Sequence, residues 1–294
     1  MAVSSAMAGD DDVPTVFTER GSIANTRHNL TQLAIEDPRP GTSAQMDPSR
    51  NNYGEVCVYC HTPHGANTRT SAPLWNRTQL DQTYQTYDEL GTSTLTQTFT
   101  QPGVNSLTCL SCHDGVTAID SIINMPGSGG YDKSAENQVI EVNHLNDWTN
   151  ASGVTTGNHA ALNESGCIAC HTPDGLGATL FAAADNFTLF QIGTDLRNDH
   201  PVGVTFPLGN PTDFNTTNIV TNTRGDAFMD ANGNSRMDKG EVRFYETGDG
   251  PEVECASCHD PHGVESAGAG SDFNPTFLRI ANDGSQLCLT CHIK

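Results

Sequence analysis

Basic side chains are scarce in this sequence, and long apolar runs are missing from it. Only 14 of the 294 residues are lysine or arginine, against 35 that are aspartate or glutamate, so the formal net charge is −21. Neutralising nucleic-acid phosphates requires clustered basic residues, whereas those present are scattered, so the composition argues against a nucleic-acid partner. No run of about 20 apolar residues occurs, and the sequence therefore predicts no membrane-spanning helix.

Large apolar side chains are also few. Leucine, isoleucine, valine and phenylalanine together account for 56 of the 294 residues. Combined with a strongly negative charge, so low a share is typical of disordered chains, which bury too little apolar surface to offset the entropy lost on folding. A folded structure therefore needs apolar surface that the side chains do not supply.

No cysteine lies outside a single recurring pattern. The ten cysteines form five C-x-x-C-H motifs, at residues 57–61, 109–113, 167–171, 255–259 and 288–292. This pattern is the attachment signal for c-type haem, in which the thiols bond to the porphyrin and the histidine becomes the proximal iron ligand. A zinc ribbon needs pairs of C-x-x-C, for which five is an awkward number, and a redox dithiol needs no histidine after its second cysteine.

The sequence thus predicts five covalently bound haems c, which would supply the missing apolar surface. The predicted attachment sites are Cys57, Cys60, Cys109, Cys112, Cys167, Cys170, Cys255, Cys258, Cys288 and Cys291. The predicted proximal ligands are His61, His113, His171, His259 and His292. We expect a mostly irregular coil fold with a few short helices and short strands, whose core is a chain of haems. Removing the haems should leave a disordered chain.

Six further histidines are candidates for the distal ligand, because a haem iron needs a sixth ligand or leaves an open position for chemistry. His64 and His262 rank first: a proline precedes each, and an offset of three residues from the proximal histidine makes the opposite face of the same haem hard to reach. Each should therefore bind a different iron. The next candidates are His28, His200 and His159, and His144 is the expected spare. The alternative is that all six are ordinary surface histidines.

Residues 230–241 fit the twelve-residue loop of EF-hand calcium sites. Its expected ligands are Asp230, Asn232, Asn234, the backbone carbonyl of Arg236, Asp238 and a bidentate Glu241. Ser235 departs from the pattern, which has glycine there. We expect one Ca²⁺ of modest affinity that fixes the long interval between the third and fourth motifs. The alternative is a polar turn that binds nothing.

An internal repeat organises the chain. The unit C-x-x-C-H-x-P-H-G followed by C-L-x-C-H occurs twice, in the first and second motifs and again in the fourth and fifth. Residues 1–22 are expected to form a flexible N-terminal arm, and residues 23–294 a single pentahaem domain. Within it we expect a first paired-haem unit at 23–130, a region with the third haem and the calcium-type loop at 131–254, and a second paired-haem unit at 255–294.

The chain resembles the multihaem c-type cytochromes of the doubled C-x-x-C-H class. It is similar to outer-surface cytochromes of metal-reducing bacteria, some of which polymerise into extracellular nanowire filaments. The resemblance rests on the five motifs, the two C-x-x-C-H-x-P-H-G continuations and the segment Asp199-His200-Pro201. It implies closely packed bis-histidine haems, electron conduction without enzymatic chemistry, and head-to-tail assembly in which His64 ligates a haem of the next subunit.

The expected partners are other copies of the chain, other multihaem cytochromes and extracellular electron acceptors. Because c-type haem is attached outside the cytoplasmic membrane, we expect an exported protein at the cell surface, with the periplasm as the alternative. Two other functions stay open. One is a soluble periplasmic electron shuttle, and the other is a reductase of the nitrite or hydroxylamine type. The reductase requires a five-coordinate haem, often marked by C-x-x-C-K, which this sequence does not contain.

Overall fold

The computed structural model describes residues 18–29, 56–78, 81–93, 95–117, 122–123, 191–223 and 225–293. The described residues form two compact units. Unit 1 takes its residues from 24–80 and 110–193, and unit 2 from 18–23, 81–109 and 194–294. The boundary falls within one helix, so that the second haem-attachment motif has residues in both. The domain boundaries expected from the sequence stay a prediction.

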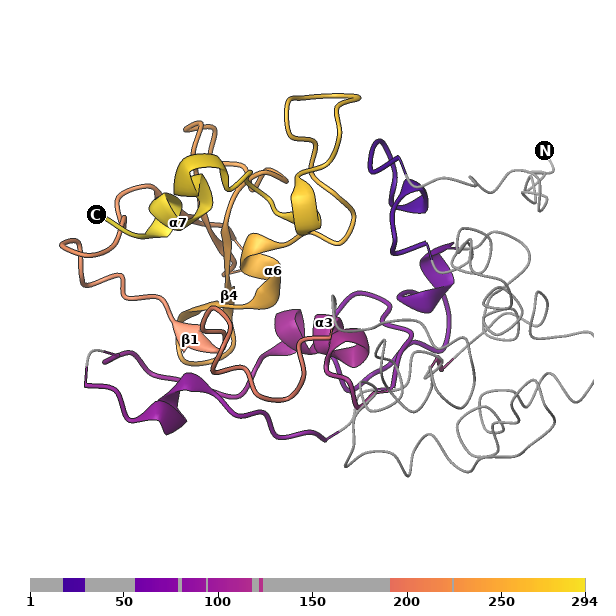
Figure 1. Cartoon of the computed structure of the whole chain (residues 1–294), viewed down its shortest axis with the longest axis horizontal. Coiled ribbons are helices and arrows are strands. Elements are labelled where there is room, and N and C mark those ends of the chain that lie inside the picture. The colour runs from indigo at the N-terminus through magenta and orange to yellow at the C-terminus, as the bar shows by residue number, and fades with distance from the viewer. Residues whose placement is uncertain are drawn as a thin grey trace, which may run out of the picture. The chain divides into compact units, whose positions relative to one another are not determined.

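Regular structure is short throughout the described part (Figure 1). The α-helices are α3 (Val104–His113), α6 (Cys255–Cys258) and α7 (Gln286–Cys291). The 3-10 helices are η2 (Ile23–Asn25), η4 (Val56–Tyr59), η5 (Tyr87–Leu90), η10 (Pro275–Phe277) and η11 (Asp283–Ser285). The strands are β1 (Val204–Thr205), β2 (Ile219–Thr221), β3 (Ala227–Met229), β4 (Arg243–Glu246) and β5 (Pro251–Val253). The prediction of a mostly irregular chain with short elements is confirmed for these residues.

Unit 1 has a small apolar cluster beside the first motif. Val58, Tyr59 and Ile122 are buried together, and Cys60 packs against them. Next to it Arg77 is fully buried, and its guanidinium donates to the hydroxyl and the carbonyl oxygen of Ser111 at 3.1 and 2.8 Å. These contacts join the first motif's surroundings to the second motif, because Ser111 lies between its two cysteines.

Unit 2 contains an antiparallel five-stranded sheet with the order β1-β5-β4-β3-β2. One apolar cluster forms its core, with the members Val204, Phe206, Ala227, Met229, Val242, Phe244 and Val253. The loop at 230–241 connects β3 to β4, and α6 begins two residues after β5 ends. The sheet therefore positions both the calcium-type loop and the fourth motif.

Candidate haem sites

The first motif forms a 3-10 turn whose histidine is held by a returning segment of the chain. The amide of His61 donates to the carbonyl of Cys57 at 2.7 Å. The ring Nδ1 of His61 donates to the carbonyl of Pro73 at 2.8 Å, and the ring meets Trp75 edge-on at 5.9 Å between centroids. A donating Nδ1 fixes the tautomer in which Nε2 carries the lone pair, which is the form that ligates a metal.

The fourth motif lies on the short helix α6, and its histidine is held in the same way. Nδ1 of His259 donates to the carbonyl of Thr276 at 2.8 Å. The returning chain pairs with the motif through Asp260 N to Phe277 O at 2.8 Å, as Thr62 N pairs with Leu74 O at 2.9 Å in the first motif. Leu74 and Phe277 hold the same place in the two returning segments, and both have positive φ, 53° and 60°. Such angles are costly for residues other than glycine and cluster at functional sites.

Sequence reasoning missed these returning segments, although a signal for them exists. Residues 73–77 and 275–279 share the pattern proline, any residue, tryptophan or phenylalanine, any residue, arginine. The hydrogen-bonded register differs from this alignment by one residue, because Leu74 and Phe277 accept the equivalent bonds. The acceptors are backbone carbonyls. Because every residue has one, the residue types do not identify which carbonyls accept. Only the recurrence of the pattern after both C-x-x-C-H-x-P-H-G segments could have indicated the role.

The second and fifth motifs lie on longer helices than the four-residue α6 of the fourth motif. α3 carries Cys109 and Cys112, and α7 carries Cys288 and Cys291. A spacing of three residues on a helix places both thiols on one face, as two bonds to one porphyrin require. In each case the proximal histidine lies at the end of the helix, as the last residue of α3 or immediately after α7.

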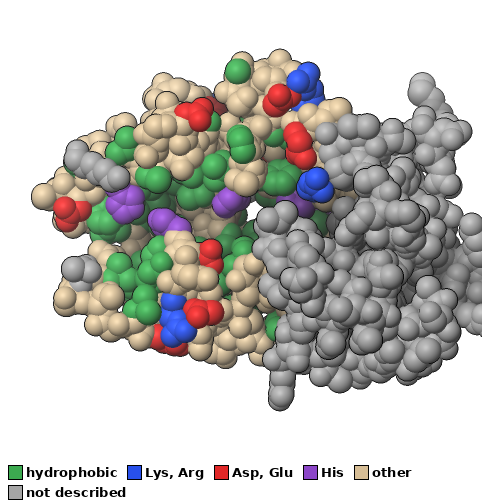
Figure 2. All heavy atoms as spheres, in the orientation of Figure 1, with side chains coloured by type: hydrophobic (Ala, Val, Ile, Leu, Met, Phe, Trp, Pro, Cys, Tyr) green, Lys and Arg blue, Asp and Glu red, His purple; other side chains and the backbone are tan. Residues whose placement is uncertain are grey.

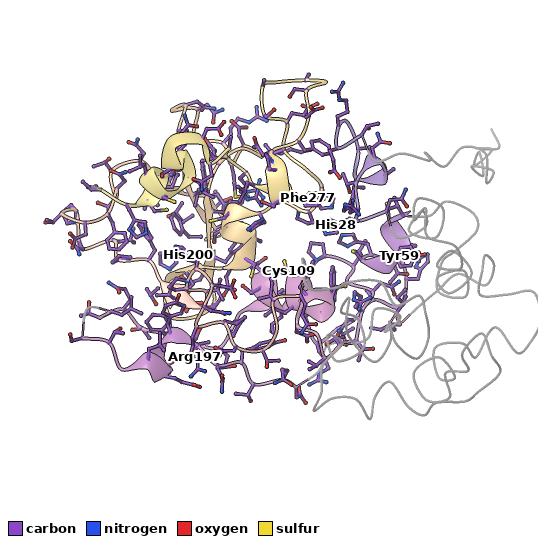
Figure 3. All side chains as sticks on the ribbon, in the orientation of Figure 1. His28, Tyr59, Cys109, Arg197, His200 and Phe277 are labelled. Carbon is purple, nitrogen blue, oxygen red and sulfur yellow. The ribbon has the colours of Figure 1, made fainter. Side chains whose placement is uncertain are left out.

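Two of the predicted distal histidines face proximal histidines of these helical motifs. The rings of His28 and His113 have their centroids 6.4 Å apart at an interplanar angle of 73°, and those of His200 and His292 also lie 6.4 Å apart, at 66°. Imidazoles that share one metal through nitrogens at about 2 Å each have ring centres about 6 Å apart. The residues therefore fit an iron held between each pair, and Figure 3 labels His28 and His200.

The surface near the motifs also fits an apolar macrocycle. Leu74, Leu289 and Ile293 are about half exposed, and each lies next to or within a motif or its returning segment. Histidine side chains reach the surface among hydrophobic ones (Figure 2). Exposed large apolar side chains beside histidines are the surroundings that a covalently attached porphyrin would cover.

Cysteines of different motifs lie near one another within each unit. Burial, followed by the nearby Cys112, raises the pKa of Cys60 to about 12. In unit 2 a hydrogen bond with Cys109 lowers the pKa of Cys255. Burial and then neighbouring thiols of the fourth and fifth motifs raise the pKa of Cys291 to about 12. None of the described cysteines is in a disulfide, so their thiols fit attachment of haem.

The structure describes two of the four remaining candidates for the distal ligand. His64 and His262 are exposed and follow the first and fourth motifs as the sequence requires, and their role as ligands stays a prediction. The third motif, with Cys167, Cys170 and His171, lies outside the described residues. The same holds for His144 and His159.

The calcium-type loop is closed by its own backbone amides. Asp230 accepts from the amides of Gly233 and Ser235 at 2.8 and 2.9 Å, and Glu241 accepts from those of Ala231 and Asp238 at 3.0 and 2.9 Å. Ser235 has φ 58°, the left-handed conformation that glycine usually supplies at this position. Across the described ranges, no group of three or more histidine, cysteine or acidic side chains is arranged to hold a metal ion. Calcium binding therefore stays a prediction.

A comparison with protein families supports part of this site. Residues 250–294 match the family described as the doubled CXXCH motif. The matched segment contains α6 and α7 with the fourth and fifth motifs, and it supports covalent haem c of the kind carried by multihaem electron-transfer cytochromes. No curated protein matches the chain. No helix among the residues placed by the structure is long and apolar enough to cross a membrane.

Proposed function

We propose that the chain is a pentahaem c-type cytochrome that carries electrons over long distances without transforming a substrate. The observation that carries this proposal is that two pairs of imidazoles, His28 with His113 and His200 with His292, lie with their ring centroids 6.4 Å apart. Haem supplies the one-electron redox centre, and the residues of this chain set its ligation, burial and spacing. Because methionine ligation, which raises the potential, is not used, the potentials should be low.

The spectrum of the oxidised holoprotein tests this proposal. Five haems per chain and mainly low-spin iron are expected, since each iron would have two histidine ligands. His28→Ala should convert one haem to a high-spin form and leave the others low-spin. His144→Ala is the matched control, because this histidine is the expected spare. Mainly high-spin iron in the unaltered protein would contradict the proposal.

The remaining ligands complete the set. His64, His262 and His159 would serve the irons of the first, third and fourth motifs. We propose that the chain assembles head to tail into an extracellular filament, with His64 ligating a haem of the next subunit and with other multihaem cytochromes or extracellular acceptors as electron partners. A heterologous contact that does not close on itself gives a filament. Support comes from the sequence resemblance and from the exposure of His64.

Electron microscopy of the purified protein separates the two electron-transfer alternatives. Filaments that are lost in His64→Ala support assembly through this residue, whereas discrete particles of the unaltered protein favour the soluble periplasmic shuttle. A multihaem reductase would require an open iron position. Binding of cyanide or nitrite to one haem of the unaltered protein would favour that function.

We also propose that the loop at 230–241 binds one Ca²⁺ and stabilises the connection between β3 and β4. The support is the loop's closure by Asp230 and Glu241, both buried, with Ser235 in the left-handed conformation. Calorimetric titration of the holoprotein with Ca²⁺ should show one site, which Glu241→Gln removes. Asp226→Asn, outside the loop, is the control.

A further inference from the structure

The two C-x-x-C-H-x-P-H-G segments differ at the residue two positions before the second histidine. In the fourth motif this residue is Asp260, whose Oδ1 accepts hydrogen bonds from the backbone N and the ring Nδ1 of His262 at 3.0 and 3.1 Å. In the first motif it is Thr62, whose hydroxyl donates to the backbone carbonyl of His64 at 2.8 Å. Of these two segments, only that of the fourth motif has a carboxylate at this position.

The Asp260 carboxylate is itself held in place. Its residue is 7% exposed, and Oδ2 accepts from Nη1 of Arg279 at 3.3 Å. Arg279, 4% exposed, is anchored in turn by the carbonyls of Ala256 at 2.9 Å and Lys239 at 3.0 Å. A buried guanidinium with three acceptors fixes one carboxylate oxygen, which leaves the other directed at the imidazole. The arrangement is preorganised and does not depend on a mobile surface pair.

The first motif lacks this support. The arginine of the first returning segment, Arg77, is fully buried but donates to the hydroxyl and carbonyl of Ser111 in the second motif. Thr62 is 2% exposed and brings no charge to the segment. The two segments are therefore alike in sequence pattern and in backbone pairing, and they differ in the charge beside the second imidazole.

A carboxylate that accepts the Nδ1 proton changes an imidazole in two ways. It fixes the tautomer, so that metal ligation falls to Nε2, and it raises the basicity of the ring. A more basic axial ligand stabilises the ferric more than the ferrous state, so it lowers the reduction potential of the iron that it binds. A neutral carbonyl acceptor, as at His61 and His259, has a weaker effect.

We infer that Asp260 is a positioning residue which makes the haem ligated by His262 lower in potential than the haem ligated by His64. The inference rests on the proposed function, because it needs both histidines to be axial ligands. It implies that the haems ligated by these two histidines differ in reduction potential, although the two sequence segments repeat.

Spectroelectrochemical titration of the holoprotein, combined with electron paramagnetic resonance, tests the inference. In Asp260→Asn the amide oxygen can still accept from Nδ1, but the negative charge is gone. One midpoint potential should rise, the other potentials should not move, and all haems should stay low-spin. Low-spin haems with no change in any potential would overturn the inference and leave the proposed function standing. Mainly high-spin haem in the unaltered protein would overturn the proposed function, and the inference with it.

A second measurement does not depend on Asp260→Asn folding around the buried Arg279. His262→Ala and His64→Ala each remove one low-spin component from the titration, which identifies the two haems in the unaltered protein. The component lost in His262→Ala should have the lower potential. Equal potentials, or the reverse order, would overturn the inference.

Discussion

The two copies of the internal repeat, one with the first and second motifs and one with the fourth and fifth, resemble each other at the haem sites. They differ in the residues that surround these sites. In both, the histidine of the first C-x-x-C-H donates to a carbonyl of a returning segment, and the histidine of the second C-x-x-C-H lies 6.4 Å from another histidine ring. Among the described residues, unit 1 contains an apolar cluster of three buried side chains, whereas unit 2 contains a sheet with a larger apolar core. The same site geometry in two surroundings indicates that the motif and its returning segment set it locally.

The surroundings differ again at the residue before each first cysteine. Val56 holds this place in the first motif, and Glu254 holds it in the fourth. Glu254 is 1% exposed, accepts from the amide of Gly103 at 2.9 Å and from the Ser106 hydroxyl, and caps α6. It thus ties α6 to the first turn of α3 within unit 2. The fourth motif is held by a buried polar network, and the first by apolar packing.

The largest expected effect comes from withholding haem. The composition predicts that the haem-free chain is disordered, but the sheet changes this expectation. Amide hydrogen exchange of the haem-free chain should show protection only within 204–253, where the apolar side chains of the sheet form a core of their own. Residues 56–78 of unit 1 should exchange freely, because their packing requires the porphyrin. Similar protection in both regions would contradict this difference between the units, and no protection in either would show that the sheet core also depends on haem.

A second test weakens the sheet alone. Phe244 is fully buried against Phe206, with ring centroids 4.4 Å apart. Phe244→Ala should lower the free energy of unfolding by about 3–5 kcal/mol, because it leaves a cavity in the core. Chemical denaturation followed by circular dichroism measures the loss, and Leu208→Ala, at a side chain that is about half exposed, is the matched control. If Phe244→Ala also removes the low-spin signal of the haem that we propose between His28 and His113, the local origin of the site is refuted.

Glu254 predicts a pH dependence that the first motif does not share. Burial raises its pKa from 4.5 to about 7, with the hydrogen bond from Ser106 opposing and the nearby Glu252 adding to the shift. Between these values the folded state holds a proton that the unfolded state has lost, so stability falls as the pH rises from about 4.5 to 7, by up to about 3 kcal/mol. Denaturation at several pH values measures the slope, which Glu254→Gln should remove. A slope that persists in this variant would assign it to another group.

The sequence predicts which residues attach haem, because C-x-x-C-H is a chemical requirement confined to five contiguous residues, and the family match supports this for the fourth and fifth motifs. It ranked His28 and His200 as candidate ligands but did not indicate that they would lie beside His113 and His292. Pairing across such long intervals depends on how the chain returns on itself, which residue types do not specify. The sequence did not predict the five-stranded sheet either. Its strands have two to four residues, too few for an alternating pattern to stand out.

The smallest expected effect concerns the left-handed residues of the returning segments, which are Leu74 in the first and Thr276 and Phe277 in the second. Leu74 is 55% exposed and has φ 53°, so Leu74→Gly should relieve backbone strain while losing little packing. A gain of about 1 kcal/mol in the holoprotein is expected after the greater flexibility of glycine in the unfolded chain is included. Phe277→Gly is the matched variant in the other copy, and it should gain less or lose stability because Phe277 is half-buried. Thermal denaturation measures both. If Leu74→Gly instead destabilises the holoprotein, Leu74 contacts the haem, and the left-handed backbone serves to present an apolar side chain to the porphyrin.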